Sequence, residues 1–223
     1  MPARIAGGAF AIAALCVGAW AGPSAAAGEG DWIDLLGPDW RSNWTYDPFI
    51  RNSRRALQVF QLEPDGVLRT DKTWAPVHLY YVGPVSGGVF RNFELKAEVK
   101  LDTGANGGIY FHTAIPKRSW PKKGYEIKFN NTHRQRWKTG SLHGSGVPNS
   151  VIVRKSPVKD NEWFKFDLIV RGKRIIAKIN GKTMTDWTEP PDKNRLRGGT
   201  IALQRHTKGI RFRNLRIKLL PDD

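Results

Sequence analysis

Residues 93–101 place the strongest constraint on the fold, because apolar and charged side chains alternate there without a break. Every odd position from Phe93 to Leu101 is apolar, and every even position carries a glutamate or a lysine. A period of two predicts a β-strand with one face against a core. Residues 104–108, which read Gly-Ala-Asn-Gly-Gly, tolerate positive φ angles and predict a turn that reverses the chain.

The same alternation returns in two segments after this turn, residues 109–113 and 125–130. The first segment has Ile109 and Phe111 at odd positions, and the second has Tyr125, Ile127 and Phe129; we assign these side chains to the core. The even positions then share the opposite face of the sheet. The side chains that we expect to lie together on this open face are Tyr110, His112, Glu126 and Lys128.

Short strand-like segments fill most of the remaining chain, and no long helical period interrupts them. The expected strands are residues 57–62, 67–70, 78–82, 140–143, 150–154, 163–171, 174–179, 183–187, 200–206 and 210–219. Asn180-Gly181 predicts a two-residue hairpin turn of type I′. In residues 210–219, the apolar side chains of one face continue one residue late after Phe212. This shift predicts a β-bulge near Arg213 and Asn214. The fold class that follows is all-β, a sandwich of two antiparallel sheets.

The N-terminus has the features of an export signal. Arg4 supplies a positive charge, residues 5–21 form an apolar run, and residues 25–27 are three alanines of the kind that a signal peptidase reads. We therefore predict a signal peptide over residues 1–27 and a single domain over residues 28–223, with no membrane span after cleavage. A retained membrane anchor is the alternative, although the run is shorter than the roughly 20 apolar residues that a span requires.

The position of the single cysteine indicates the cellular compartment in which we expect the protein. The single cysteine, Cys16, lies inside the apolar run, so that cleavage leaves a protein without disulfides, thiolate nucleophiles or thiolate metal ligands. An exported protein without disulfides is more typical of the bacterial periplasm or exterior than of a eukaryotic secretory route.

The formal net charge of +16 is strongly basic and favours attraction to polyanions. Nucleic acid is not the expected partner, because no helix-turn-helix or zinc-finger pattern occurs and the basic residues are scattered over strand exteriors and loops. We expect the charge to attract anionic glycans or envelope surfaces. The alternative is that the charge only keeps the protein soluble.

Several short motifs resemble the 3-keto-disaccharide hydrolase-like domain family, in the same order and with similar spacing from about residue 32 to the C-terminus. These motifs are residues 92–95, 104–110, 124–127, 138–142, 180–181, 203–204 and 212–214. The resemblance implies a jelly roll of the concanavalin A-like type, similar to legume lectins and glucanases.

The resemblance also implies a reaction, the cleavage of a disaccharide whose glycosyl unit carries a ketone at carbon 3. The ketone acidifies the hydrogen on carbon 2, so that a base can form an enolate and expel the anomeric substituent, with water added afterwards. Such a site needs a base, a cation or hydrogen-bond donor that stabilises the developing oxyanion, and a proton source for the leaving group. Simple retaining hydrolysis is disfavoured, because no strand carries the Glu-x-Asp-x-x-Glu cluster that would place two carboxylates about 5 Å apart.

The catalytic candidates are Glu126, His112 and His143. Glu126 matches the glutamate of the family's Gly-Tyr-Glu motif, whereas His112 and His143 stand where relatives often carry arginine and tyrosine, and Lys128 replaces a common glutamine. The alternative for all four is a solvated polar sheet face. Because Glu126 is expected to be exposed, its replacement by glutamine should change the free energy of unfolding by no more than about 1 kcal/mol.

Further side chains are candidates for contacting the sugar. Asn106 matches the Gly-Ala-Asn turn of the family and has left-handed turn geometry as its alternative role. Loop tryptophans can stack on a sugar ring or simply anchor their loops. The predicted substrate-binding residues are Tyr110, Lys128, Asn106, Gln204, His206, Trp120 and Trp137.

No sequence pattern demands a metal or a cofactor, since zinc motifs, EF-hand loops, phosphate loops and dinucleotide fingerprints do not occur. Calcium held by backbone carbonyls of a sandwich loop is left open. Two functions remain: an enzyme that cleaves 3-keto-glycosides, and a non-catalytic, lectin-like module that binds a saccharide, because fold alone does not set chemistry.

Overall fold

The computed structural model describes residues 31–46, 56–70, 76–116, 119–144, 151–191 and 197–222. The predicted signal peptide, with Cys16, lies outside the described residues. Among the described residues, no helix is both long and apolar enough to cross a membrane.

Helices are short and few in the described chain. They are α1 (Trp40–Asn43), α2 (Ala56–Val59) and the 3₁₀ helix η2 (Val85–Gly88). The strands are β1 (Ile33–Asp34), β2 (Trp44–Tyr46), β3 (Phe60–Leu62), β4 (Leu68–Thr70), β5 (Val77–Tyr81), β6 (Phe93–Leu101), β7 (Asn106–Thr113), β8 (Tyr125–Phe129), β9 (Leu142–His143), β10 (Trp163–Arg171), β11 (Arg174–Ile179), β12 (Lys182–Thr188), β13 (Thr200–Thr207) and β14 (Ile210–Leu219).

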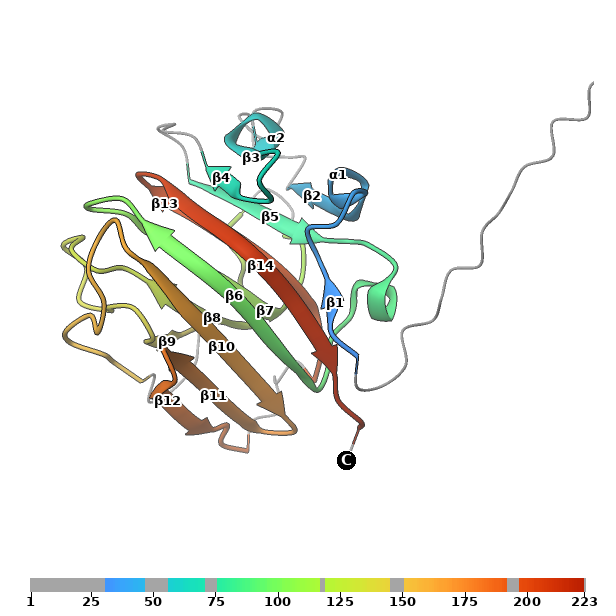
Figure 1. Ribbon diagram of the computed structural model, residues 1–223. Coiled ribbons are helices and arrows are strands. Elements are labelled where there is room, and N and C mark those ends of the chain that lie inside the picture. Colours follow the sequence, from blue (N-terminus) through green and yellow to red (C-terminus); the bar gives the residue numbers. More distant parts are fainter. Residues whose placement is uncertain are drawn as a thin grey trace, which may run out of the picture.

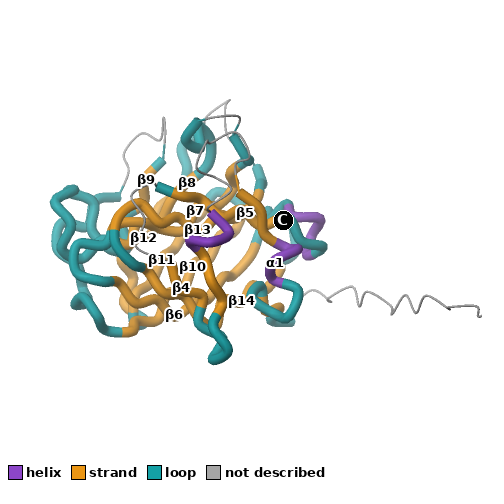
Figure 2. The backbone as a smooth tube through the Cα atoms, turned by 90° about the horizontal axis from the view of Figure 1, so that it is seen from above, coloured by secondary structure: helices purple, strands orange, loops and turns teal. Residues whose placement is uncertain are grey.

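The strands form two antiparallel sheets, packed face to face (Figures 1 and 2). The larger sheet has the order β12-β11-β10-β6-β14-β4-β3, and β1 pairs with β14 beside it. The smaller sheet has the order β2-β5-β13-β7-β8-β9. The prediction of an all-β jelly-roll sandwich is confirmed.

One hydrophobic core fills the space between the two sheets, and the alternation in the sequence decides which side chains enter it. In β6, the odd positions from Phe93 to Leu101 are buried, while the charged positions between them are partly or fully exposed. β10 behaves in the same way, with Phe164, Phe166 and Leu168 in the core. From the other sheet, Ile109, Ile127 and Phe129 meet them. Burial of large apolar side chains from both sheets is the main stabilising contribution in such a fold.

Two local predictions are confirmed. Asn180 and Gly181 both have positive φ, as a type I′ turn requires, and they connect β11 to β12. The register between β14 and β6 shifts between Arg213 and Arg216, where Asn214 also has positive φ. This bulge returns Leu215 and Ile217 to the core after the slip in the pattern.

The turn after β6 connects the two sheets rather than two neighbouring strands. β6 pairs with β10 and β14 in the larger sheet, whereas β7 pairs with β8 and β13 in the smaller one. Both strands turn their apolar side chains to the same core, so their alternation is identical to that of a hairpin.

Three expected strands are wrong in part. Of residues 140–143, only 142 and 143 form a strand, β9. Residues 56–59 form α2, so the strand expected over residues 57–62 is reduced to β3. Within the segment expected as a strand over 150–154, the described residues 151–154 belong to no strand. Carbonyl oxygens of Val151 and Val153 nevertheless accept hydrogen bonds from the amides of Leu142 and Lys138, at 3.0 Å each. This segment therefore supports β9 through isolated bonds instead of a regular ladder.

Candidate functional site

The face of the smaller sheet that points away from the core is covered rather than open. Glu126 is 1% exposed, Lys128 6% and Tyr110 9%. The alternation assigned these side chains correctly to the face opposite the core, but the expectation that this face is open to solvent is wrong. Two loops, carrying Trp120 and Trp137, add side chains beside this face and line a space with it.

A cavity of about 240 Å³ lies between this sheet face and the two loops. It is lined by Asn106, Tyr110, Trp120, Glu126, Lys128, Gln135, Trp137, His143, Gln204 and His206. Nine of the ten site residues predicted from the sequence are thus brought together around one space. The volume is just below the usual range of small-molecule sites and suits about one sugar ring.

Strand register arranges the polar side chains of the cavity floor in two rows. Tyr110 of β7 lies opposite Glu126 of β8, which lies opposite His143 of β9. In the next row, Gly108 separates Gln204 of β13 from Lys128 of β8. A Cβ atom on Gly108 would lie 2.6 Å from Glu126 Oε1, so the absence of a side chain there makes room for the carboxylate.

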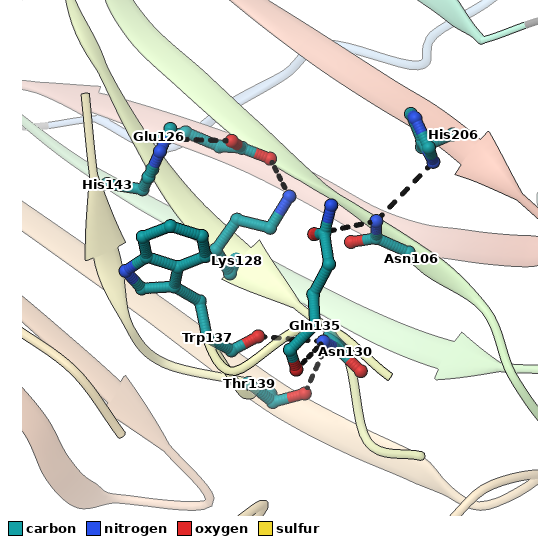
Figure 3. A network of polar contacts seen from close by, with 9 residues as sticks. All are labelled: Asn106, Glu126, Lys128, Asn130, Gln135, Trp137, Thr139, His143 and His206. Atoms are coloured by element: carbon teal, nitrogen blue, oxygen red, sulfur yellow. Dashed lines mark hydrogen bonds and ion pairs between the residues drawn. The ribbon is translucent and has the colours of Figure 1, made fainter. Parts of the chain in front are cut away.

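Glu126 joins Lys128 and His143 in one of the two groups of polar contacts drawn in Figure 3. Lys128 Nζ donates a hydrogen bond to Glu126 Oε1 at 2.9 Å, and His143 Nδ1 lies 3.7 Å from the other carboxylate oxygen, Oε2. Tyr110 lies opposite Glu126 on the neighbouring strand, and burial together with the Glu126 charge raises the pKa of Tyr110. The carboxylate thus contacts Lys128 and His143, and the phenol of Tyr110 stays protonated at neutral pH.

A second cluster of polar side chains lies at the other end of the cavity. Asn106 Nδ2 donates to Gln135 Oε1 at 3.1 Å and lies 3.4 Å from His206 Nδ1 (Figure 3). The side-chain oxygens Asn106 Oδ1 and Gln204 Oε1 have no hydrogen-bond partner within the described part of the chain. Buried amide oxygens without a partner are costly. They are acceptors well suited to the hydroxyl groups of a ligand.

The histidines around the cavity are biased toward the neutral form. Burial lowers the pKa of His143, and Lys128 lowers it further, while the Glu126 charge acts in the opposite direction. Burial and the Lys128 charge also lower the pKa of His206. Burial lowers the pKa of His78, which lies next to the cavity, to about 3. At pH 7 these imidazoles are available as bases and hydrogen-bond partners rather than as cations.

His112 is the one predicted site residue that lies elsewhere, and its placement on the open face is wrong. The pairing of β7 with β13 is irregular at this point, and His112 has a φ of +47°. This bulge interrupts the alternation and turns the imidazole toward the rings of Phe93, Phe111 and Tyr125. His112 Nε2 lies 2.8 Å from the carbonyl oxygen of Arg91, which is a structural contact.

Sequence reasoning missed two neighbours of the site. Gln135 lines the cavity from the loop between β8 and β9. His78 of β5 is buried and stands edge-on to the rings of Tyr110 and Trp120, at centroid distances of 5.2 and 5.0 Å. The alternation of β5 could have assigned His78 to the polar face. The pairing of His78 with Gln204, which brings it to the site, has no signal in the sequence.

Metal ligands do not gather in the described residues. No group of three or more His, Cys, Asp or Glu side chains there could hold a metal ion.

Comparison with known proteins agrees with the motifs found in the sequence. The sequence profile of the 3-keto-alpha-glucoside-1,2-lyase-like domain matches residues 31–218 of the chain. No curated protein matches.

Solved structures share the fold at low sequence identity. A candidate glycosyl hydrolase from Parabacteroides distasonis superposes with a TM-score of 0.65 at 17% identity, over 86% of this chain and 94% of the other. A second one from the same organism gives 0.61 at 23% identity, over 85% and 100%. A carbohydrate-binding module from Bacillus subtilis gives 0.55 at 12% identity, over 79% and 95%. At these identities, the similarity establishes the architecture.

Proposed function

We propose, from the premise that this chain belongs to the 3-keto-alpha-glucoside-1,2-lyase-like domain family, that it cleaves the glycosidic bond of 3-keto-glycosides by elimination. The observation that carries this proposal is the group of His143, Glu126 and Lys128 in a cavity with room for about one sugar ring. The three side chains supply a base, its anionic partner and a cation, which are the groups that an enolate-forming reaction requires.

In the proposed reaction, a base removes the hydrogen from carbon 2 and the electron pair of that bond passes toward the ketone at carbon 3, forming an enolate. The enolate then forms the double bond between carbons 1 and 2, and the bond from carbon 1 to the glycosidic oxygen breaks. The departing oxygen takes up a proton. Addition of water to the double bond would give the free 3-keto sugar, so lyase and hydrolase outcomes share the first step.

His143 is the proposed base. Its side chain is partly exposed, whereas Glu126 is buried and its Oε1 already accepts a hydrogen bond from Lys128. With Nδ1 toward the carboxylate, Nε2 is the nitrogen left for the substrate, and Glu126 would stabilise the imidazolium that forms. A carboxylate that orients a histidine in this way is a recurring solution in acyl-transfer enzymes. A contact of 3.7 Å is long, and such contacts often shorten when substrate binds.

Lys128 is the proposed stabiliser of the enolate oxygen. An ammonium group has three donors, and one of them is engaged by Glu126 Oε1. The remaining donors lie at the cavity that Lys128 lines. A preorganised cation in a site with little water lowers the energy of a developing oxyanion more than it would in bulk solvent.

The other end of the cavity would hold the sugar. The acceptor oxygens of Asn106 and Gln204 can each take a hydroxyl proton, and Trp120 and Trp137 offer aromatic walls. Aromatic faces and a small number of polar groups are typical of small-molecule sites.

Incubation of the purified protein with a 3-keto-α-glucoside and with its unoxidised parent tests this proposal. Release of the aglycone from the 3-keto compound alone is the expected result, because only the ketone acidifies carbon 2. Cleavage of both compounds at similar rates, or of neither at saturating concentration, would contradict the proposal.

The plot of kcat/KM against pH should fall on the acid side at a pH below 6.5, which is the usual pKa of histidine. The active form of His143 is the neutral one, and its pKa is lowered, so the rate rises as pH increases through that lowered pKa and is level at neutrality. Replacement of Glu126 by glutamine removes a charge that raises this pKa and should move the limb to lower pH. Replacement of Lys128 by methionine should move it to higher pH. NMR titration of the His143 ring checks both directions independently of turnover.

A non-catalytic saccharide-binding module is the second candidate, because the unpaired amide oxygens and the tryptophan walls would serve binding without any base. Calorimetry separates the two. Tight binding of an unoxidised sugar, combined with no turnover of its 3-keto form, would favour the binding module.

Export to the periplasm or exterior is a further part of the proposal, and it rests on the N-terminal sequence. Expression of the full chain in a bacterium, followed by N-terminal sequencing of the mature protein, should give a start near Gly28. Recovery of the intact N-terminus in the membrane fraction would favour the retained anchor.

A further inference from the structure

The segment that contributes most of the cavity lining has a highly unequal distribution of charge. Between Asp102 and Asp160 there are eleven lysine or arginine residues but a single acidic residue, Glu126. Glu126 is buried and paired with Lys128. Apart from Lys159, which precedes Asp160 and lies 3.9 Å from Glu162 Oε1, the other cations of this segment have no acidic residue next to them in the sequence.

Exposed cations lie on both loops that cover the cavity. On one loop, Lys122 and Lys123 are exposed and follow Trp120. On the other, Arg134 and Arg136 are exposed and flank Gln135, a residue of the cavity wall. We call these four residues the basic rim. Within the described part of the chain, none of them forms a salt bridge with a carboxylate.

One member of the basic rim is held directly against the cavity wall. Arg136 Cζ lies 4.5 Å from the centroid of the Trp137 ring, and Trp137 lines the cavity. A guanidinium stacked on an indole keeps its edge free for a planar anion, and its fork of donors matches a carboxylate or a sulfate.

The interior of the cavity, in contrast, is electrically balanced. The Lys128 charge is paired with Glu126, and the neighbouring histidines are biased toward the neutral form. The uncompensated positive charge is thus outside the space that holds one ring. A ligand that fits this distribution is uncharged where it is enclosed and anionic where it leaves the cavity.

We propose that the basic rim selects acidic saccharides, in which the unit next to the enclosed ring carries a carboxylate or a sulfate ester. This inference rests on the proposed function, since it takes the enclosed ring to be a sugar, but it is tested by binding alone. Arg134 and Arg136 are the residues that would contact the anion, and Lys122 and Lys123 would add attraction from the opposite loop.

Calorimetric titration with three disaccharides tests the proposal: maltose, its analogue with glucuronate as the second unit, and its analogue with a 6-sulfate on the second unit. At low ionic strength, at least one acidic analogue should bind about tenfold more tightly than maltose, and the pair identifies which anion is preferred. High salt should reduce the ratio of the affinity for the acidic analogue to the affinity for maltose, because exposed charges are screened. The double variant Arg134→Gln/Arg136→Gln should reduce this affinity ratio toward one.

The matched control is Arg171→Gln/Arg216→Gln, which removes the same charge from exposed positions on the larger sheet. This control should keep the ratio of the unaltered protein. Three results would overturn the proposal: neither acidic analogue binding more tightly than maltose, no binding of any acidic analogue, or an equal loss of the ratio in both double variants. Because no turnover is required, failure here leaves the cleavage of 3-keto-glycosides to be judged by its own assay.

Discussion

Replacement of His143 by glutamine is expected to lower kcat for cleavage of a 3-keto-α-glucoside about 1,000-fold, within the range for loss of a general base. Glutamine retains much of the volume and can still donate to Glu126, but it cannot remove a proton from carbon 2. The His143 side chain is 37% exposed, so the fold should tolerate the change. Single-turnover measurements at saturating substrate, together with a thermal melt, would separate the loss of chemistry from a loss of fold.

His112→Asn is the companion variant, because His112 was an equal catalytic candidate on sequence grounds. Asparagine tolerates the positive φ at this position, but it loses the ring contacts with Phe93 and Tyr125. This variant should unfold at a lower temperature and keep kcat within about threefold, a difference of under 1 kcal/mol in the barrier. Loss of kcat in His112→Asn without any change after replacement of His143 would show that the base has been assigned to the wrong histidine.

Glu126→Gln should destabilise the protein by about 3 kcal/mol, the lower end of the cost of breaking a buried ion pair by removing one partner. The expectation of no more than about 1 kcal/mol assumed an exposed side chain, and the structure contradicts that premise, because Glu126 is 1% exposed and Lys128 is 6% exposed. Glutamine leaves the ammonium of Lys128 buried without its anion. Urea denaturation followed by far-UV circular dichroism measures the difference.

A double-mutant cycle makes this prediction specific to the pair. Lys128→Met alone should also be destabilising, and Glu126→Gln/Lys128→Met should cost about 2 kcal/mol less than the sum of the single changes, as contacting partners do. Glu63→Gln serves as the matched control, since Glu63 forms a surface ion pair with Arg69 at 3.2 Å; such pairs contribute about 1 kcal/mol or less. Equal costs for Glu63→Gln and Glu126→Gln would mean that the buried pair adds nothing special to stability.

Alternation in the sequence was sufficient to predict which way most strand side chains point, and this explains why Tyr110, Glu126 and Lys128 line one cavity. The tryptophans of the cavity, Trp120 and Trp137, were predicted instead as loop residues that could stack on a sugar ring. A period of two assigns each residue to a face, and a shift by one residue would bury polar side chains in the core of the sandwich. It does not assign a strand to a sheet. β6 and β7 have the same pattern but lie in different sheets, because both pack on the same core.

The failures have equally local causes. His112 was misplaced because a bulge, marked by its positive φ, changes the direction of one side chain without leaving a trace in the apolar pattern. The burial of Glu126 was missed because the cover comes from loops, whose path is not encoded by periodicity. His78 was missed because its role depends on the pairing of β5 with β13, a contact between residues far apart in the chain.

The most direct test of the proposed mechanism is the fate of the hydrogen on carbon 2. A 3-keto-α-glucoside carrying deuterium at carbon 2 should react more slowly than the unlabelled compound, and the sugar product should have lost its deuterium to the solvent, as mass spectrometry or NMR would record. Both results follow if His143 removes this hydrogen before the glycosidic bond breaks. Cleavage without an isotope effect, in which the sugar product retains the deuterium at carbon 2, would indicate direct displacement at carbon 1 and would contradict the enolate mechanism.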